Sequence, residues 1–368
     1  MRKVVGILLM VTLVFSISVA FAAPAVKWVK SDYVSGLQVP VGMHKKVYYI
    51  ESFLADVAHR MMVSGAERAF KQMGWDCEVL NPENDLQRQI KMVEDSLAKG
   101  DMDAMIISAV DSEGIGATVK KVSDRNIPVV VVDRWPSLGK MTFGVGGDWY
   151  THGKTATQEM VKRLTKKNGS PKGKVIAMII GMEVNALRDR ATAFRDVMKK
   201  YPNIKVIEKT APADPVKDAQ VLKDALIANP DADAIWNIAD VFGMNYVATM
   251  KEIGMLYPVG NPKHIILCSM DGTDWALEEI RNGNFDSTVS SNLIEWGYMA
   301  AWSLGQHFGG KQAVLNKVGQ LKVSGAGWKA QISSMGNGPY LGINSVLVIK
   351  DNVDNKMLWG NRVKEFVK

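Results

Sequence analysis

The chain has 368 residues, of which 47% are hydrophobic and 23% are charged, which is the balance of a globular protein with a substantial core. This length allows two or three domains, or one domain with two lobes, and the composition excludes intrinsic disorder, a collagen-like repeat and a disulfide-stapled miniprotein. The net charge of +7 is scattered along the chain rather than gathered on one arm or face, so it does not favour a nucleic-acid partner.

The first residues have the layout of a secretory signal peptide. Two basic residues at positions 2 and 3 precede a mainly apolar run at 4–19, and Ala20-Phe21-Ala22 then places small residues where a signal peptidase reads. The apolar run is short for a membrane span. We expect residues 1–23 to be a signal peptide, cleaved near Ala22 or Ala23, that leaves a periplasmic protein not embedded in the membrane.

Short apolar runs alternate with helix-like segments from residue 46 onward. Residues 104–108 and 128–132 are almost wholly apolar, as is typical of strands that are buried on both faces of a parallel sheet. The first series of predicted strands covers residues 47–51, 77–80, 104–108, 128–132 and 141–145, with helices at 56–73, 85–99, 113–125 and 149–166.

The same order of elements then begins again. Strands are predicted at residues 174–180, 205–208, 234–237 and 264–268, and helices at 185–200, 216–228, 241–253 and 274–281. This repetition predicts two similar lobes, each a doubly wound parallel sheet, and hence an α/β fold class.

A long stretch of chain remains after the second series, with a strand at 285–290, a helix at 296–308 and a strand-like piece at 345–349. We expect it to return to the first lobe, because parallel strands need long crossovers, and so to create a multi-strand hinge. The predicted division is an N-terminal lobe of residues 24–147 plus about 292–318, and a C-terminal lobe of residues 148–291 plus part of 319–368, the tail that crosses the hinge.

Motifs of the common catalytic and cofactor sites are missing from the sequence. The five histidines are isolated and lack metal-ligand spacing, and no Gly-x-Ser-x-Gly elbow occurs. Residues 169–174 have one residue too few between their glycines for a phosphate loop, and residues 144–147 lack the third glycine of a dinucleotide fingerprint. We expect no cofactor, no metal and no enzymatic activity, although carboxylate catalysis leaves little local signature.

Charged residues follow the carboxyl ends of several predicted strands, which is where open α/β sheets bind ligands. Asp133-Arg134, Asp240 and Asp271 each follow a strand, and Arg190 lies early in the helix after another. Helix capping is the competing interpretation for any single aspartate. The adjacent charges of Asp133 and Arg134 are harder to explain in that way.

These residue types suit a small polyhydroxylated ligand. A hydroxyl group both donates and accepts hydrogen bonds, so carboxylates and guanidinium groups bind it from opposite sides. Aromatic rings cover the apolar faces of a sugar, and several lie near predicted strand ends: Phe53, Trp135, Trp149 and Trp236.

Several local motifs together resemble a known family. They are the run Ile-Pro-Val-Val-Val-Val-Asp133-Arg134, Leu187-Arg188-Asp189-Arg190 followed by Phe194, Met270-Asp271-Gly272-Thr273, and Ser287-Thr288-Val289. Over roughly residues 46–310 the chain resembles the periplasmic sugar-binding proteins of ABC importers, in particular the ribose-binding-protein-like group with the type I periplasmic binding protein fold.

The resemblance implies ligand contacts from Asp133, Arg134, Arg190 and Asp271, and places Asp56 and His59 where the family has asparagine and aromatic residues. At three further positions the chain departs from the family: Ala239 is followed by Asp240, Ser291 is followed by Asn292, and Pro215 is preceded by Asp214. The candidate ligand-binding residues are Phe53, Asp56, His59, Asp133, Arg134, Arg190, Asp214, Asp240, Asp271 and Asn292.

The predicted function is therefore an extracytoplasmic solute-binding protein. It would capture a sugar or sugar alcohol between its lobes and deliver it to an ABC transporter permease, as a monomer and without nucleic acid. One alternative is a ligand sensor, for an autoinducer-type furanose or another small polar solute, that signals to a membrane receptor. An exported carboxylate-dependent hydrolase is a second alternative. A sugar-responsive transcription regulator is disfavoured, because a leader stands where its helix-turn-helix domain would begin.

Overall fold

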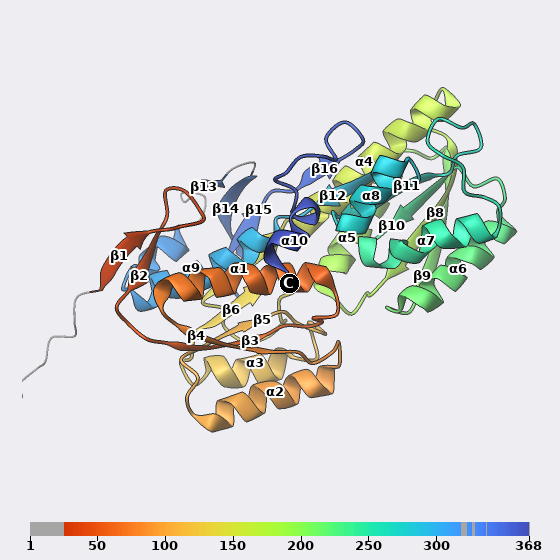
Figure 1. Ribbon diagram of the computed structural model, residues 1–368. Helices are drawn as coiled ribbons and strands as arrows, with labels where there is room; N and C mark the ends of the chain where they lie inside the picture. Colours follow the sequence, from red (N-terminus) through yellow and green to blue (C-terminus); the bar gives the residue numbers. More distant parts are fainter. Residues whose placement is uncertain (1–25, 318–321, 326–327, 336, 368) are drawn as a thin grey trace, which may run out of the picture.

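Two twisted sheets organise the chain into two lobes that lie side by side (Figure 1). The structure is a computed structural model that describes residues 26–317, 322–325, 328–335 and 337–367. The predicted signal peptide, residues 1–23, lies outside the described residues. Each lobe has a mainly parallel sheet with helices on both faces, so the predicted fold class is confirmed.

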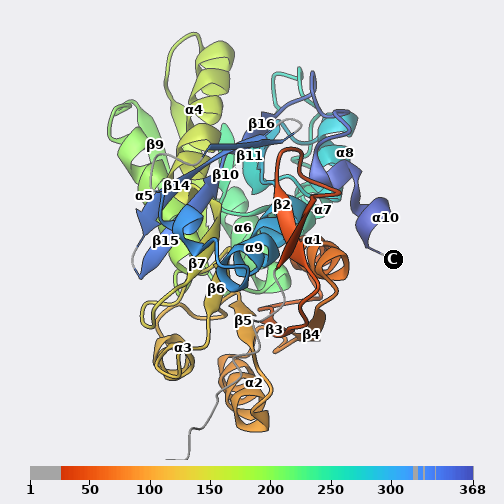
Figure 2. The same cartoon turned by 90° about the vertical axis from the view of Figure 1, so that its left-hand side faces the viewer.

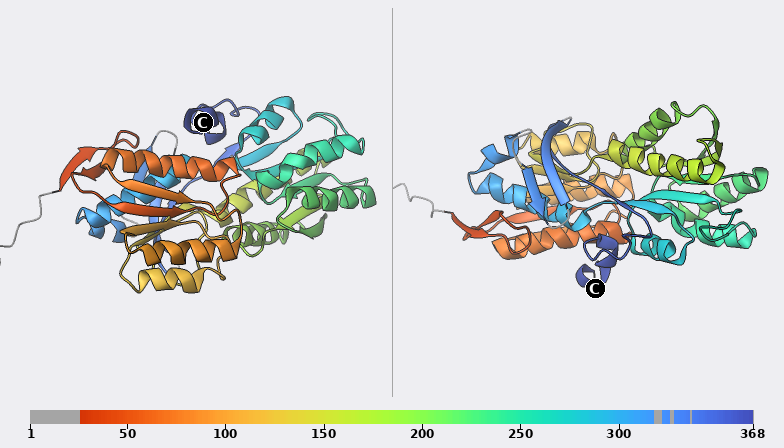
Figure 3. Two further views of the ribbon diagram at one scale, coloured as in Figure 1. Left: turned by 60° about the horizontal axis from the view of Figure 1, so that its bottom comes forward. Right: turned by 90° about the horizontal axis from the view of Figure 1, so that it is seen from above.

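The first lobe has an eight-stranded sheet in the order β13-β14-β15-β7-β6-β5-β3-β4. Its strands are β3 (Lys46–Ile50), β4 (Asp76–Leu80), β5 (Ala104–Ile107), β6 (Val129–Val132), β7 (Phe143–Gly147), β13 (Lys322–Gly325), β14 (Trp328–Met335) and β15 (Gly338–Ile343). Helices α1 (Val57–Met73) and α9 (Leu293–Phe308) cover one face, and α2 (Leu86–Lys99) and α3 (Gly116–Ser123) cover the other (Figure 3). Every residue of β5 and β6 is therefore buried.

The second lobe repeats this plan in a six-stranded sheet of order β16-β12-β11-β10-β8-β9. Its strands are β8 (Gly173–Ile180), β9 (Ile204–Ala211), β10 (Ala234–Asn237), β11 (Ile266–Asp271), β12 (Ser287–Ser290) and β16 (Val346–Val348), and its helices are α4 (Trp149–Asn168), α5 (Asn185–Met198), α6 (Pro215–Ala228), α7 (Asp240–Glu252) and α8 (Asp274–Asn282). The orders β4-β3-β5-β6-β7 and β9-β8-β10-β11-β12 are equivalent. The two lobes are therefore similar, as the repeated sequence pattern predicted.

Local capping explains where the helices begin and end. Asp56 starts α1 by accepting a hydrogen bond from the amide of Ala58 at 2.9 Å, and Gly74 ends it in the left-handed conformation with φ 74°. The helix predicted at residues 113–125 is shorter, because the Asp111 side chain first caps a turn at the amides of Glu113 and Gly114.

The chain passes between the sheets at three neighbouring places that form the hinge. They lie between β7 and α4, between β12 and α9, and between β15 and β16. The side chain of Asn292 in the second connection donates to the carbonyl of Asn344 in the third at 2.6 Å. Of the C-terminal part of the chain, β13–β15 thus belong to the first lobe's sheet and β16 to that of the second.

Both ends of the described chain pack on the first lobe. The antiparallel hairpin β1 (Lys27–Lys30) and β2 (Gln38–Val41) lies near α1 and α9. After the short helices η1 (Gln312–Asn316) and η2 (Trp359–Asn361), helix α10 (Val363–Phe366) lies beside α1 (Figure 2). Across the described ranges, no helix combines the length and apolar character needed to cross a bilayer.

Helices α1 and α9 pack with their backbones in contact, and this contact depends on two glycines. A Cβ added at Gly65 would run into the carbonyl of Ile294, and one added at Gly297 would run into the carbonyl of Met62. Both obstacles are backbone atoms, which cannot rotate away.

We expect Gly297→Ala to lower the free energy of unfolding by about 2 kcal/mol or more, because the two helices must separate. In an exposed helix, Gly→Ala instead stabilises by about 1 kcal/mol. Urea denaturation of the purified protein measures the sign. An unchanged or raised midpoint for the variant contradicts the proposed close contact.

Candidate functional site: a cavity between the lobes

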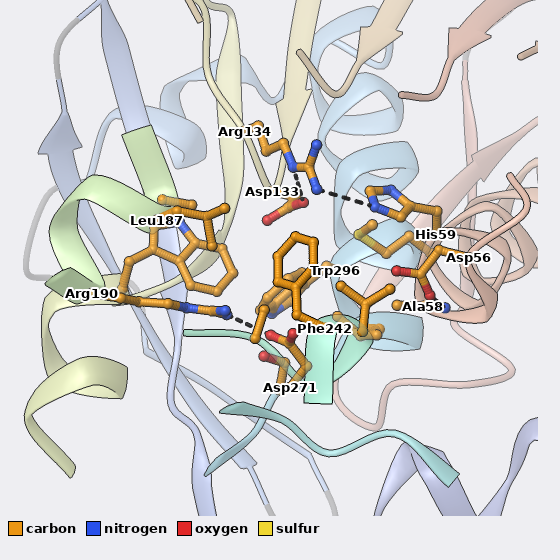
Figure 4. A pocket seen from close by; sticks show the side chains of 17 residues that line it. Asp56, Ala58, His59, Asp133, Arg134, Leu187, Arg190, Phe242, Asp271 and Trp296 are labelled. Atoms are coloured by element: carbon orange, nitrogen blue, oxygen red, sulfur yellow. Dashed lines mark hydrogen bonds and ion pairs between the residues drawn. The ribbon is translucent and has the colours of Figure 1, made fainter. Parts of the chain in front are cut away.

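A cavity lies where the carboxyl ends of the two sheets face each other (Figure 4). The first lobe, the second lobe and the hinge all contribute to its lining, which contains charged, aromatic and aliphatic side chains. The lining residues are Asp56, Ala58, His59, Met62, Asp133, Arg134, Trp149, Ala186, Leu187, Arg190, Ala239, Val241, Phe242, Asp271, Ser291, Leu293 and Trp296.

The first lobe presents an acid–base pair directly after β6. Asp133 has a φ of 64°, which turns the chain sharply at the end of the strand. Its carboxylate lies 3.2 Å from Nε of Arg134. Burial raises the pKa of Asp133, and the adjacent guanidinium of Arg134 opposes this rise.

The second lobe presents a matching pair from two different elements. Nη2 of Arg190, on α5, lies 2.5 Å from Oδ1 of Asp271 at the end of β11, and its Nη1 donates to the carbonyl of Ile238 at 3.0 Å. The guanidinium also lies 4.9 Å from the ring centre of Trp149. Burial raises the pKa of Asp271, Arg190 opposes the rise, and the carboxylates of Asp56 and Asp133 in the other lobe add to it. The carboxylates of the first lobe therefore raise the pKa of Asp271 in the second lobe from across the cavity.

A buried chain of polar groups lies behind Arg134. Nη2 of Arg134 is 3.5 Å from Nε2 of His59, and Nδ1 of His59 is 2.8 Å from the Glu51 carboxylate. Burial disfavours charge on both of these groups, but their mutual attraction outweighs it, so the pKa of His59 is raised and that of Glu51 is lowered. Glu51 was assigned only to a strand in the sequence analysis; its place just after β3, at the sheet edge that binds ligands, was the available signal.

Aromatic side chains form the apolar walls. Trp149 and Trp296 meet edge to face, with ring centres 5.1 Å apart and planes at 87°, and Phe242 also lines the cavity. Only Trp149 was singled out from the sequence. Phe242 and Trp296 sit on helices, where an aromatic residue is normally read as core, so no local signal distinguished them.

Six of the ten candidate residues line the cavity, namely Asp56, His59, Asp133, Arg134, Arg190 and Asp271. Phe53 lines a second, adjoining pocket that shares Asp56, His59 and Arg134 with the first. The remaining three candidates, Asp214, Asp240 and Asn292, do not line either pocket, and each has another partner.

Backbone contacts explain these three departures from the expectation. Asp214 caps α6 by accepting from the amides of Val216 and Lys217 at 2.9 and 3.1 Å, while its neighbours Ala213 and Pro215 line the adjoining pocket. The side chain of Asn292 donates to the carbonyl of Asn344, which lies in another connection of the hinge. Asp240 is fully buried and accepts from the amides of Gly272 and Thr273 at 2.8 and 3.0 Å. It thus holds the turn that follows Asp271 instead of facing the cavity.

The aromatic candidates Trp135 and Trp236 also lie outside the cavity lining. Trp236 is fully buried in the second lobe against Phe194, with ring centres 4.5 Å apart, and Trp135 packs on Tyr340 at 5.8 Å. For the part of the chain that the structure describes, no group of three or more histidine, cysteine, aspartate or glutamate side chains is arranged to hold a metal ion.

The two-lobed fold and the position of the cavity define a class of binding proteins that enclose a ligand between hinged lobes. The sequence matches the family described as periplasmic binding protein domain over residues 50–312. The chain belongs to this family, as the resemblance in the sequence predicted.

Known relatives agree with this assignment. The chain is 25% identical over 294 residues to the ribose import binding protein RbsB of Bacillus subtilis (strain 168), covering 79% of this chain and 88% of the relative. A galactofuranose binding protein superposes with a TM-score of 0.71 at 18% identity, covering 88% of this chain and 99% of that one. The XylFII-LytSN complex contains a chain with a TM-score of 0.68 at 20% identity, covering 84% and 99%.

We expect the buried carboxyl of Asp240 to make stability depend on pH. Burial and the neighbouring Asp271 carboxylate raise the pKa of Asp240 to about 7, whereas an aspartate in the unfolded chain titrates near about 3.9. Between these values the folded protein holds a proton that the unfolded chain has lost. The free energy of unfolding should therefore fall as the pH rises from about 4 to about 7, by up to about 1.4 kcal/mol per pH unit.

Asp240→Asn should remove this contribution, because the amide does not titrate. The measurement is urea denaturation of both proteins at several pH values, with Asp274→Asn at the exposed start of α8 as the control. Parallel stability curves for wild type and Asp240→Asn would show that Asp240 does not carry this proton.

Proposed function

We propose that the protein is an extracytoplasmic solute-binding protein that captures a sugar or sugar alcohol between its lobes and delivers it to an ABC importer permease. The observation that carries this proposal is the convergence of two charged pairs, one from each lobe, on a cavity with aromatic walls. The names of the relatives support it, since they are binding proteins for sugars and related solutes.

The chemistry of the lining fits an uncharged ligand with many hydroxyl groups. Carboxylates of Asp56, Asp133 and Asp271 accept hydrogen bonds, and the guanidinium groups of Arg134 and Arg190 donate them. In each lobe an acid pairs with a base, so neither of these two pairs needs a charged ligand to compensate it. The faces of Trp149, Trp296 and Phe242 suit the apolar face of a sugar ring. His59 extends the polar lining, and Phe53 adds an aromatic ring in the adjoining pocket.

Closure of the lobes is the proposed mechanism. A ligand that contacts Asp133 and Arg134 on one lobe and Arg190 and Asp271 on the other makes both sets of contacts only when the lobes are together. Binding therefore shifts the population toward the closed form. A permease that prefers the closed form shifts the same equilibrium further. No cofactor takes part in this scheme.

A sensory role is the second candidate function, and the fold neighbour in the XylFII-LytSN complex is the observation that favours it. Reconstitution separates the two roles. In proteoliposomes with its permease, a loaded importer component stimulates ATP hydrolysis, whereas a sensor component alters its receptor without doing so.

We expect a thermal-shift screen of pentoses, hexoses, deoxysugars and polyols, with D-ribose among them, to find a sugar or polyol that raises the melting temperature, because a ligand of the folded state stabilises it.

Arg190→Ala should then weaken binding of that compound roughly 10- to 100-fold in calorimetry, since charge-assisted hydrogen bonds are lost. The circular dichroism spectrum should stay that of the wild type.

Arg195→Ala on the same helix is the matched control, because Arg195 pairs with Glu208 on an exposed surface and not in the cavity. It should bind like the wild type. Equal affinity for Arg190→Ala and Arg195→Ala removes Arg190 from the site, and chemical conversion of the bound compound would favour an enzyme instead.

Export is the remaining part of the proposal. We expect the protein from the periplasmic fraction of an expressing bacterium to begin at residue 23 or 24, because the small residues at 20 and 22 direct cleavage there. N-terminal sequencing or intact mass measures this. An N-terminus at Met1 in that fraction would contradict a cleaved signal peptide.

A further inference from the structure

The C-terminal tail, which is the described chain after β16, contacts the backbone of a residue that lines the cavity. After β16 it lies on the second lobe, where the Arg281 guanidinium contacts Asp354 at 2.8 Å, and η2 then packs on α8. From η2, the indole N–H of Trp359 donates to the carbonyl oxygen of Asp271 at 2.7 Å. Trp359 is only 1% exposed and is not among the residues that line the cavity. It therefore touches the backbone of a lining residue without facing the cavity itself.

The peptide unit that joins Asp271 to Gly272 is held at both ends. Its carbonyl accepts from Trp359 and, at 3.1 Å, from the amide of Ser291. Its N–H donates to Asp240 at 2.8 Å and to the hydroxyl of Thr288 at 3.1 Å. These contacts stabilise an unfavourable backbone conformation, since the φ of Asp271 is 123°. A residue with a side chain keeps such a conformation only where its surroundings impose it.

Gly360 allows the tail to approach this peptide so closely. A Cβ at position 360 would lie 2.5 Å from the carbonyl oxygen of Gly272 and 2.9 Å from the amide nitrogen of Asp274. Any larger residue would push the tail away from the turn after β11. The glycine beside Trp359 is thus what permits the indole to reach Asp271.

The far end of the tail is anchored on the first lobe. Nη1 of Arg362 lies 3.1 Å from the hydroxyl of Tyr33 and 3.7 Å from the carboxylate of Glu295. The carbonyl of Phe366 accepts from the hydroxyl of Ser64 on α1 at 3.1 Å. Chain ends usually fray unless they are tied down. Contacts on both lobes hold Trp359 in place.

We propose that Trp359 is a positioning residue for ligand binding. It fixes the Asp271–Gly272 peptide in the conformation that directs the Asp271 carboxylate toward Arg190 and the cavity. This inference rests on the proposed function, because it takes Asp271 to be a ligand contact. The tail thereby contributes to affinity from outside the cavity.

Trp359→Phe tests the inference, because it keeps an aromatic ring and removes the indole N–H. Trp302→Phe is the matched control: the Trp302 indole is 3% exposed and also donates to a backbone carbonyl, that of Gln38, at 3.1 Å in the first lobe. Calorimetry with the sugar or polyol from the thermal-shift screen should show about fivefold weaker binding for Trp359→Phe. Trp302→Phe should bind like the wild type. Equal affinities of the two variants would overturn the inference.

Hydrogen exchange in the ligand-free protein gives a readout that does not depend on the proposed function. The amides of Gly272 and Thr273 should exchange about fivefold faster or more in Trp359→Phe and at the wild-type rate in Trp302→Phe. If the wild type binds no compound of the screen, the proposed function fails, and this exchange result alone decides whether Trp359 holds the peptide. If Gly272 and Thr273 exchange at the wild-type rate in Trp359→Phe, then Trp359 does not fix this peptide.

Gly360→Ala provides a second variant should Trp359→Phe fail to fold. It leaves the indole in the chain and displaces the tail, so it should give the same faster exchange of Gly272 and Thr273. Exchange at the wild-type rate in a folded Gly360→Ala protein counts against the inference.

Discussion

The structure depends on how charge is compensated at the boundary between the lobes. A buried charge is costly unless it is paired, and here each pair lies within one lobe: Asp133 with Arg134, and Arg190 with Asp271. Lobe opening therefore breaks neither pair. Among the described residues, Nε of Arg190 has no hydrogen-bond partner. The charges of these two pairs thus stay compensated, while hydrogen-bonding capacity remains next to the cavity.

The hinge and the cavity share residues, which links closure to the environment of the site. Trp149 follows the first hinge connection and contacts both Arg190 and Trp296. Ser291 and Asn292 form the second connection, where one lines the cavity and the other binds Asn344 in the third. A rotation at the hinge must therefore shift side chains that line the cavity. Under the proposed closure, the movement that brings the lobes together would therefore also change the shape of the cavity.

Much of the fold could be predicted from local patterns. The all-apolar runs of β5 and β6 indicated buried parallel strands, and Asp56 with Gly74 marked the ends of α1. Strand β7 begins two residues later than predicted, at Phe143, since runs of small and apolar residues mark a strand without marking its ends. The tail was the least predictable part, because its partners on β11, α1 and α9 lie far away in the sequence.

The candidate site shows where such reasoning stops. Aspartate is used both to cap helices and to face ligands, and the sequence does not distinguish these uses. Asp133 and Asp271 line the cavity, while Asp214 and Asp240 bind backbone amides. Trp296 and Phe242 were not candidates, because a helical sequence pattern shows an apolar face but not what that face covers.

By itself, the sequence determined the two α/β lobes, their order of strands and helices, and the charged residues at the carboxyl ends of strands. These follow from periodicity, capping and strand polarity, which act over a few neighbouring residues. Only the tertiary structure decided which charges meet, which aspartates turn inward to the backbone, and that Trp359 reaches Asp271. Those outcomes depend on contacts between segments separated by scores of residues, and no local pattern records them.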